Sequence, residues 1–231
     1  MTKLAALVRR AVPRRLKQLV KERLRVRRFR AACRELLALA PQGGLSPGLI
    51  GRLQRGWENE GFTGGSDLLA LLSRLVPGSR GDLLECGCGL STIVLGALTR
   101  GTGRRVYSLE HVEEWAERVR REVELLGFTH VSVLLAPLRP YDGYCWYAFD
   151  EAYLPREIEF ALCDGPPGDT PGGRVGLLRR LGGRFASGSI ILLDDAGRPS
   201  EQEVLRDWAE RFGSRHRLEG NQIAVAIVEM P

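Results

Sequence analysis

Residues 83–94 read Leu-Leu-Glu-Cys-Gly-Cys-Gly-Leu-Ser-Thr-Ile-Val, and this stretch constrains the fold more than any other part of the chain. Its apolar start is typical of a buried strand, the glycines break that strand, and the residues after them favour a helix. Gly87 and Gly89 lack a Cβ, so a ligand can approach the backbone, and the free N–H groups at a helix N-terminus point toward it. The pattern predicts a pocket for a nucleotide-like ligand.

An alternation of strands and helices surrounds this glycine turn. The expected strands cover 82–86, 105–109, 131–135, 158–163, 189–193, 216–218 and 222–228. The expected helices cover 47–57, 68–76, 91–99, 113–126, 173–181 and 200–212. Such alternation predicts an α/β fold with a doubly wound, mostly parallel sheet. The turn Glu219-Gly220-Asn221 predicts a closing antiparallel hairpin.

The N-terminal part differs in charge from the rest. Residues 1–34 carry thirteen Lys or Arg and the single acid Glu22, so the remainder of this chain of net charge +6 is acidic by about six charges. Leucines at helical spacing predict two helices separated near Pro13, the second ending before Pro41. We therefore expect a basic helical extension, residues 1–60, followed by one α/β domain, residues 61–231.

The basic extension is open to several partners. Its cations suit anionic lipid, nucleic acid or the acidic face of a partner subunit, whereas its leucines suit packing on the domain or on a second copy. Nucleic acid is the weaker expectation, because the predicted cleft collects acids rather than bases. We expect contact with an anionic membrane or a homo-oligomer through these helices.

Cysteine usage and hydropathy bear on the compartment. Five scattered cysteines do not resemble a disulfide framework, which favours a reducing cytoplasm. No apolar run approaches the length of a membrane span. The N-terminus is too charged, and Pro13 breaks it too early, for a secretory signal.

Acidic residues follow the expected strands at the points where those strands end. They are Glu85, Glu110, Asp164, Asp194 and Asp195. Ligands of such sheets bind at the carboxyl ends of the strands. A carboxylate at Glu85 repels a pyrophosphate but suits an amino group or a sulfonium, and Thr92 replaces the third glycine of a dinucleotide fingerprint. These features favour S-adenosyl-L-methionine as cofactor.

Two acidic positions carry further expectations. Glu110 lies about twenty residues past Gly89, the distance at which an acid accepts both ribose hydroxyls; its alternative role is a helix N-cap. Asp164, Asp194 and Asp195 repel one another unless a cation or a proton relieves them, and all-oxygen ligands suit Mg²⁺ or another divalent cation. The alternative is that these aspartates cap helices or hold loops.

An aromatic-rich segment, 141–149, lies between the third and fourth expected strands, on the ligand side of the sheet. We expect it to form a wall of the acceptor pocket, with contributions from Tyr141, Tyr144, Trp146 and Tyr147. The alternative is an apolar cluster that packs on the core.

The chain resembles class I S-adenosylmethionine-dependent methyltransferases over about residues 62–229. The resemblance rests on Leu84-Glu-Cys-Gly-Cys-Gly-Leu-Ser-Thr, Tyr107-Ser-Leu-Glu-His, Leu162-Cys-Asp-Gly-Pro-Pro-Gly and Ile191-Leu-Leu-Asp-Asp. It is similar to a bacterial branch of small O-methyltransferase-like proteins with the Asp-Gly-Pro-Pro and Leu-Asp-Asp motifs. The resemblance implies a seven-stranded sheet in the order 3-2-1-4-5-7-6 with the last strand antiparallel.

The resemblance also implies roles for individual residues. The implied cofactor contacts are Glu85, Gly87, Cys88, Gly89, Ser91, Thr92, Glu110, His111 and Leu138. Asp164 and Asp195 correspond to the catalytic centre, and with Asp194 to the Mg²⁺ ligands of the metal-dependent branch. Pro166 and Pro167 stand where that branch often has a lysine base, and Ala136-Pro137 stands where many relatives have an acid near the adenine.

These observations lead to one expected function and two alternatives. We expect transfer of a methyl group from S-adenosylmethionine to a hydroxyl of a small molecule or glycan, with the metal requirement left open. A nicotinamide-dependent oxidoreductase is the first alternative, against which Glu85 and Thr92 count. A non-catalytic binding module with the same fold is the second.

Overall fold

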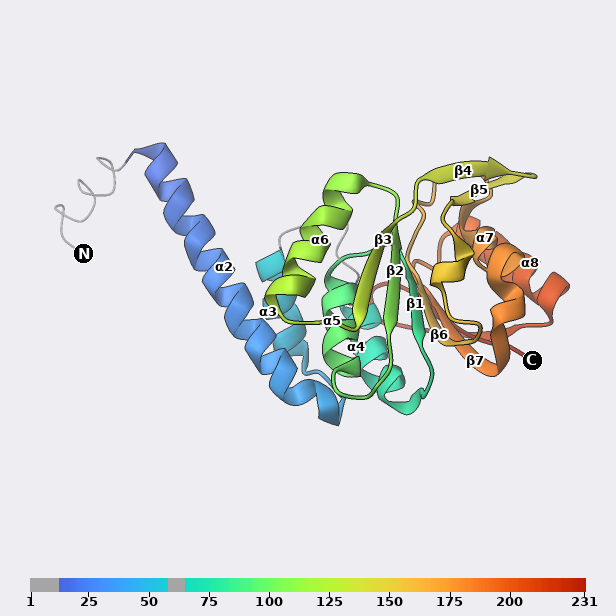
Figure 1. Ribbon diagram of the computed structural model, residues 1–231, viewed down its shortest axis with the longest axis horizontal. Helices are drawn as coiled ribbons and strands as arrows, with labels where there is room; N and C mark the ends of the chain where they lie inside the picture. The colour runs from blue at the N-terminus through green and yellow to red at the C-terminus, as the bar shows by residue number, and fades with distance from the viewer. Residues whose placement is uncertain (1–12, 58–64) are drawn as a thin grey trace.

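The computed structural model describes residues 13–57 and 65–231 (Figure 1). The main helices are α2 (Arg14–Leu39), α3 (Pro47–Trp57), α4 (Ser66–Leu75), α5 (Leu90–Thr99), α6 (Glu113–Leu125), α7 (Gly176–Leu181) and α8 (Pro199–Phe212). The strands are β1 (Leu83–Cys86), β2 (Val106–Glu110), β3 (Val131–Leu135), β4 (Leu138–Tyr141), β5 (Tyr144–Tyr147), β6 (Ile158–Cys163), β7 (Phe185–Leu193), β8 (Arg215–Glu219) and β9 (Val225–Glu229).

Seven of these strands form one sheet in the order β3-β2-β1-β6-β7-β9-β8. Strands β1, β2, β3, β6 and β7 run parallel, whereas β9 is antiparallel to both β7 and β8. With β4 and β5 set aside, this is the expected order 3-2-1-4-5-7-6, and the antiparallel last strand is confirmed. The order reverses between β1 and β6, which creates the crevice where doubly wound sheets bind ligands.

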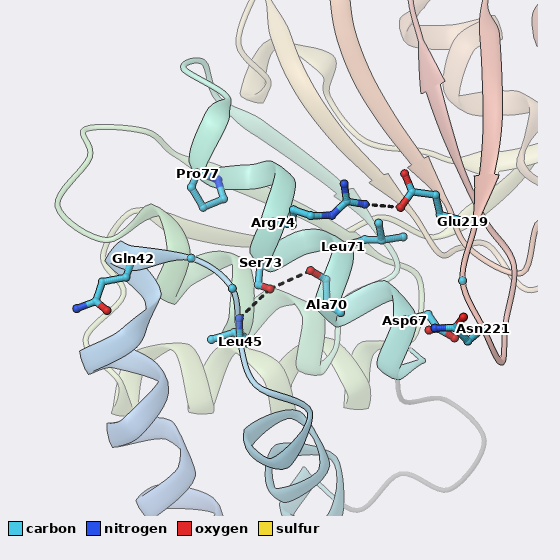
Figure 2. A pocket seen from close by; sticks show the side chains of 13 residues that line it. Gln42, Leu45, Asp67, Ala70, Leu71, Ser73, Arg74, Pro77, Glu219 and Asn221 are labelled. Carbon is cyan, nitrogen blue, oxygen red and sulfur yellow. Dashed lines mark hydrogen bonds and ion pairs between the residues drawn. The ribbon is translucent and has the colours of Figure 1, made fainter.

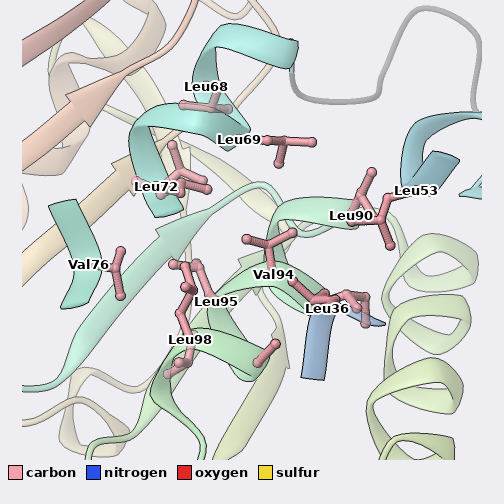
Figure 3. Close-up of a cluster of buried hydrophobic side chains, with 14 of the residues drawn as sticks. Leu36, Leu53, Leu68, Leu69, Leu72, Val76, Leu90, Val94, Leu95 and Leu98 are labelled. Carbon is pink, nitrogen blue, oxygen red and sulfur yellow. The ribbon is translucent and has the colours of Figure 1, made fainter. Parts of the chain in front are cut away.

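Two apolar layers cover the two faces of the sheet. Successive residues of a strand point to opposite faces, so Leu83 of β1 joins one layer and Leu84 joins the other. Helices α2 to α6 contribute to the first layer, and α7, α8 and the β4–β5 hairpin to the second. Figure 3 shows Leu90 of α5 beside Leu53 of α3, and Val94 of α5 beside Leu36 of α2, in the same cluster as the leucines of α4. The C-terminal half of α2 is therefore part of the core.

The structure corrects several local expectations. The segment 138–147 forms the β4–β5 hairpin, which pairs Leu138 with Tyr147. The last two strands are joined by residues 220–224, a longer connection than the expected turn. Helix α4 begins at Ser66, two residues before the expected start, with Gly65 as its N-cap, and Asp67 in its first turn accepts hydrogen bonds from the backbone of the β8–β9 connection.

Two expectations about the N-terminal part have different outcomes. The expected helix before Pro13 lies outside the described residues, whereas the second helix is present as α2 and ends at Leu39, before Pro41. Figure 1 shows the first half of α2 extending away from the sheet and its helices. Among residues 13–57 and 65–231, no helix combines the length and apolarity that crossing a membrane requires.

Candidate functional site

The carboxyl end of β1 places Glu85 in a fully buried position below the glycine turn. Oε2 of Glu85 accepts a hydrogen bond of 2.6 Å from Thr92 and another from the Ser108 hydroxyl. Oε1 is buried without a hydrogen-bond partner in the described part of the chain. Burial raises the pKa of this carboxyl to about 7, against the opposing effect of Ser108. The site therefore holds an acid that a cationic ligand would ionise.

Gly87 forms the turn itself. Its φ of +87° lies in the left-handed region, and a Cβ there would lie 3.2 Å from the nitrogen of Gly165. The turn thus needs a glycine for conformation and for its close approach to the loop after β6. Gly89, extended at φ 179°, is the N-cap of α5, and its N–H donates to Thr92 Oγ1 at 2.9 Å.

Glu110 ends β2 and faces the same turn. Oε2 accepts a hydrogen bond of 3.2 Å from the Cys88 amide, and Oε1 accepts from the amides of His111 and Val112 at 2.7 and 2.9 Å. Burial acts to raise the pKa of this carboxyl, but the His111 and Val112 hydrogen bonds hold the pKa below its ordinary value. Glu110 therefore holds the backbone that leads into α6, whose N-cap is Val112, and presents a negative charge beside the glycine turn.

Trp115 fixes the turn from a third side. Its indole nitrogen donates a hydrogen bond of 2.6 Å to the carbonyl of Cys88. The guanidinium of Arg118 lies 4.9 Å from the Trp57 ring centroid and 4.7 Å from that of Trp115. This stacked group joins α3 and α6 to the turn.

The second cluster consists of the aspartates after β6 and β7. Ligand oxygens of Asp164, Asp194 and Asp195 all lie within 4.8 Å of one another. Burial, reinforced by the neighbouring carboxylates, raises the pKa of Asp164 well above its ordinary value and that of Asp194 to about 6. One buried oxygen of Asp194, Oδ1, has no hydrogen-bond partner in the described part of the chain. Carboxylate oxygens, one of them without a hydrogen-bond partner, are the type of ligand that divalent cations such as Mg²⁺ prefer.

Arg174 lies beneath these carboxylates, and sequence analysis missed it. Its side chain is 2% exposed, and it lies 3.5 Å from Asp164 and 3.6 Å from Asp195. Glu201 of α8 is 3.8 Å away on another side. A single arginine does not balance this many acids, and the exposed Arg198, 2.8 Å from Asp195, adds the second positive charge. The acidic side chains of this cluster therefore outnumber its arginines.

Asp195 also has an unusual backbone. Its φ of +56° is the only positive value at a non-glycine residue in the described ranges. Asp tolerates the left-handed region better than most residues, but such a conformation still has a cost and is often found at functional sites.

The aromatic residues separate into two groups. Trp146 is wholly buried and packs closely on Gly176 of α7, and the Tyr147 hydroxyl reaches Gly165 beside the glycine turn. Tyr141 and Tyr144 lie near the hairpin tip, where their rings stack at 5.4 Å. The guanidinium groups over these two rings are those of Arg180 and Arg179. Within the hairpin, Tyr147 therefore lies beside the glycine turn, whereas Tyr141 and Tyr144 lie near the tip.

Comparison with solved structures identifies the fold. An O-methyltransferase from Bacillus cereus, in complex with SAH, is 16% identical, with a TM-score of 0.54 over 87% of this chain and 91% of that chain. The C-terminal domain of precorrin-6Y C5,15-methyltransferase from Rhodobacter capsulatus is 18% identical, with a TM-score of 0.51 over 76% and 94%. This chain has the class I methyltransferase fold. No protein-family model and no curated protein sequence matches it.

Within this methyltransferase fold, a separate hollow of about 540 Å³ lies between α4, the α2–α3 connection and the β8–β9 connection (Figure 2). Its charged side chains are already paired, since Arg74 binds Glu219 and Asp67 accepts two backbone hydrogen bonds. Ser73 likewise joins the Leu45 amide to the Ala70 carbonyl. These contacts tie the N- and C-terminal parts to α4, so we do not take this hollow as the functional site.

The methyltransferase fold brings most of the sequence-predicted residues into one region. Hydrogen bonds connect Glu85, Cys88, Gly89, Thr92 and Glu110, and Ser91 is buried in the first turn of α5. His111 lies with its ring 6.2 Å from that of Tyr147, the partner of Leu138 in the hairpin. Whether these residues bind a cofactor stays a prediction. The structure adds Ser108, Trp115 and Arg174, whose contacts come from distant parts of the chain and had no signal in sequence spacing.

Proposed function

We propose that this protein is an S-adenosylmethionine-dependent methyltransferase whose acceptor is a hydroxyl of a small molecule or glycan. The observation that carries the proposal is the glycine turn between two buried acids, Glu85 and Glu110, at the switch point of the sheet. A pyrophosphate would meet repulsion from Glu85, whereas the cationic methionine end of S-adenosylmethionine would gain a counter-ion.

The residues have distinct roles in this proposal. Gly87 and Gly89 let the cofactor approach the backbone, and Glu85 provides the negative charge that its amino group and sulfonium require. Glu110 offers carboxylate oxygens to the two ribose hydroxyls. The bound cofactor supplies an electrophilic methyl carbon, which passes to the acceptor oxygen while sulfur keeps the electron pair of the broken bond.

The aspartate cluster would act on the acceptor. Asp164 and Asp195 lie at the neighbouring strand end, where a carboxylate can orient the acceptor hydroxyl and take its proton as the new C–O bond forms. Holding that oxygen about 3 Å from the methyl carbon provides the largest part of the rate enhancement. A divalent cation would be held by Asp164, Asp194 and Asp195, and it would lower the pKa of the acceptor hydroxyl.

The direct test is calorimetric titration of the full chain with S-adenosylmethionine, S-adenosylhomocysteine and NADH. We expect binding of the first two ligands and none of NADH. Glu110→Gln should weaken S-adenosylmethionine binding about tenfold, because a charge-assisted hydrogen bond to ribose becomes a neutral one. Glu114→Gln, an exposed acid of α6 four residues further along the chain, is the matched control and should bind as the wild type does.

The alternative functions give different results. Binding of NADH without S-adenosylmethionine would support the oxidoreductase and contradict the proposal. Acceptor identity is addressed separately, by incubating the protein with labelled S-adenosylmethionine and fractionated small molecules and glycans. Cofactor binding with no labelled product in any fraction would contradict the catalytic part of the proposal in favour of a binding module.

A further inference from the structure

The first turns of α2 expose an apolar stripe. Leu16, Leu19, Val20 and Leu24 are between 44% and 58% exposed. With about 3.6 residues per turn, positions 16, 20 and 24 follow one another along one side of the helix, and 19 adjoins them. Four exposed large aliphatic side chains on one helix face are unusual for a surface that meets only water.

The second half of α2 buries the opposite side of the helix. Phe29, Cys33 and Leu36 belong to the core, where they pack with α3 and α5. Leu16 and Leu36 are twenty residues apart, which rotates them by about 200° around the helix axis. The stripe at Leu16–Leu24 therefore faces away from the side on which α2 docks, and Figure 1 shows this half of α2 clear of the sheet.

A basic groove meets the stripe at Leu24 and lies on the side of α2 that faces α3. It has a volume of about 1020 Å³ and lies between α2 and the end of α3, with Lys21, Leu24, Arg28 and Arg55 in its lining. Glu22, its one acid, pairs with Arg25. Lys21, Arg28 and Arg55 form no ion pair with any residue that the structure describes. Residues 15–34 together contain nine Lys or Arg and one acid.

We propose that the exposed half of α2 binds the surface of an anionic phospholipid membrane. The apolar stripe enters the acyl boundary while exposed cations on the same side of the helix, Arg23 and Arg27, contact phosphate headgroups, as in interfacial amphipathic helices. The groove behind the helix adds to the positive charge near the membrane. The helix lies at the interface and does not span the bilayer, in agreement with its charge.

Two other occupants fit the same residues less well. A second copy paired along the stripe would bring two strongly basic helices together, and like charges at such a distance repel. A complementary apolar patch elsewhere is also lacking, since the other exposed large apolar residues of the described chain, such as Leu125 and Leu218, lie on separate elements. Single-stranded nucleic acid requires exposed aromatic rings for stacking, and Phe29 of α2 is buried.

The test is flotation of the full-length protein with phosphatidylcholine vesicles that contain or lack phosphatidylglycerol. We expect at least about tenfold stronger binding to the anionic vesicles, weakened by added salt. Arg23→Glu with Arg27→Glu should reduce that binding at least about tenfold. Arg206→Glu with Arg215→Glu, exposed cations on α8 and β8, makes the same charge change and should bind as the wild type does.

A second pair of variants separates insertion from charge attraction. Leu19→Ser with Val20→Ser keeps every cation and should still reduce vesicle binding at least about fivefold, because the apolar surface that enters the acyl boundary is removed. Leu125→Ser with Leu218→Ser is the control. Equal binding by the Leu19–Val20 variant would overturn the inserted stripe.

The remaining outcomes identify the other occupants. Failure of the wild type to bind anionic vesicles would overturn the proposal. Sedimentation as a dimer that the Leu19–Val20 variant disrupts, without vesicle binding, would assign the stripe to a second copy. Binding of single-stranded RNA that is stronger than vesicle binding would assign the groove to nucleic acid. Circular dichroism of each variant verifies that α2 remains helical.

Discussion

Arg174 donates a hydrogen bond of 2.7 Å to the main-chain carbonyl of Asp194. The same guanidinium donates to the carbonyls of Cys163, Asp164 and Pro166. One buried side chain thus fastens the ends of β6 and β7, the two strands whose aspartates form the acidic cluster. Burial disfavours the charge of Arg174, yet Asp164 and its neighbours hold the pKa of Arg174 above its ordinary value.

Replacing this arginine should strongly destabilise the protein. Arg174→Met leaves buried carboxylates and carbonyls without their donor, so the free energy of unfolding should fall by about 3–5 kcal/mol. Arg174→Lys keeps the charge but cannot reach all of the carbonyls. Its free energy of unfolding should lie between that of the wild type and that of Arg174→Met. Urea denaturation measures both. Arg206→Met, an exposed control, should change the free energy by less than about 0.5 kcal/mol; a similar small change for Arg174→Met would contradict the stated role.

Glu85 should make stability depend on pH. Its pKa is about 7 in the folded chain against an ordinary 4.5, so the folded state holds this proton more tightly than the unfolded state does. The contribution of Glu85 to the free energy of unfolding is therefore largest below about pH 4.5. It falls by about 3 kcal/mol as the pH rises to about 7, because the unfolded state ionises first. Glu85→Gln does not ionise, and its loss of stability between pH 5 and pH 8 should be correspondingly smaller.

Urea denaturation of wild type and Glu85→Gln at both pH values measures this difference. Thr92 and Ser108 can still donate to a glutamine oxygen, so the variant should remain folded. Glu114→Gln, an exposed acid, should follow the wild-type pH dependence. Identical pH dependence in wild type and Glu85→Gln would contradict the raised pKa.

The glycine turn should respond differently at its two glycines. Gly87→Ala combines a left-handed φ with a Cβ 3.2 Å from Gly165, and it should cost about 1–3 kcal/mol. Gly89→Ala has an extended backbone and no atom closer than 4.0 Å to its Cβ, so stability should change by less than about 0.5 kcal/mol. Both substitutions should weaken S-adenosylmethionine binding, since each adds a Cβ where the cofactor is proposed to approach the backbone.

A further glycine separates backbone strain from steric contact. Gly101 has a φ of +73°, and a Cβ at this position would meet nothing within 4 Å, so Gly101→Ala should cost only the strain, about 1 kcal/mol. Thermal or urea denaturation measures all three variants. If Gly87→Ala proved no more costly than Gly101→Ala, close packing against Gly165 would not contribute.

Mg²⁺ should stabilise the protein through the aspartate cluster. A ligand that binds only the folded state at about 100 times its Kd adds about 2.7 kcal/mol, which for a chain of this size raises Tm by about 5–10 °C. Asp195→Asn should remove most of this shift, and Asp207→Asn, an acid of α8 paired with Arg179, should keep it. Potassium chloride at equal ionic strength controls for screening. An unchanged Tm in the wild type would show that the arginines alone balance the cluster.

Local sequence patterns predicted the sheet, and they proposed most residues of the candidate site, because strand order and strand ends depend on short-range spacing. Apolar periodicity located the strands and helices to within a few residues, and the strand–glycine–helix run placed Gly87 and Gly89 next to Glu85. The acids that end neighbouring strands were found for the same reason, since parallel strands carry their last residues to one edge. The aromatic segment was interpreted as a pocket wall or a core cluster, and its β4–β5 hairpin was not expected, because an aromatic run alone does not define strand pairing.

The sequence by itself determined which residues stand at the strand ends and which part of the chain is basic. Only the tertiary structure decided how their charges are balanced. Arg174 looks like an ordinary helix residue in the sequence, and Trp115 like an ordinary apolar one, until folding brings the first under Asp164 and Asp194 and the second onto Cys88. Periodicity records which side of an element is apolar, whereas charge balance and pKa depend on distances between segments far apart in the chain.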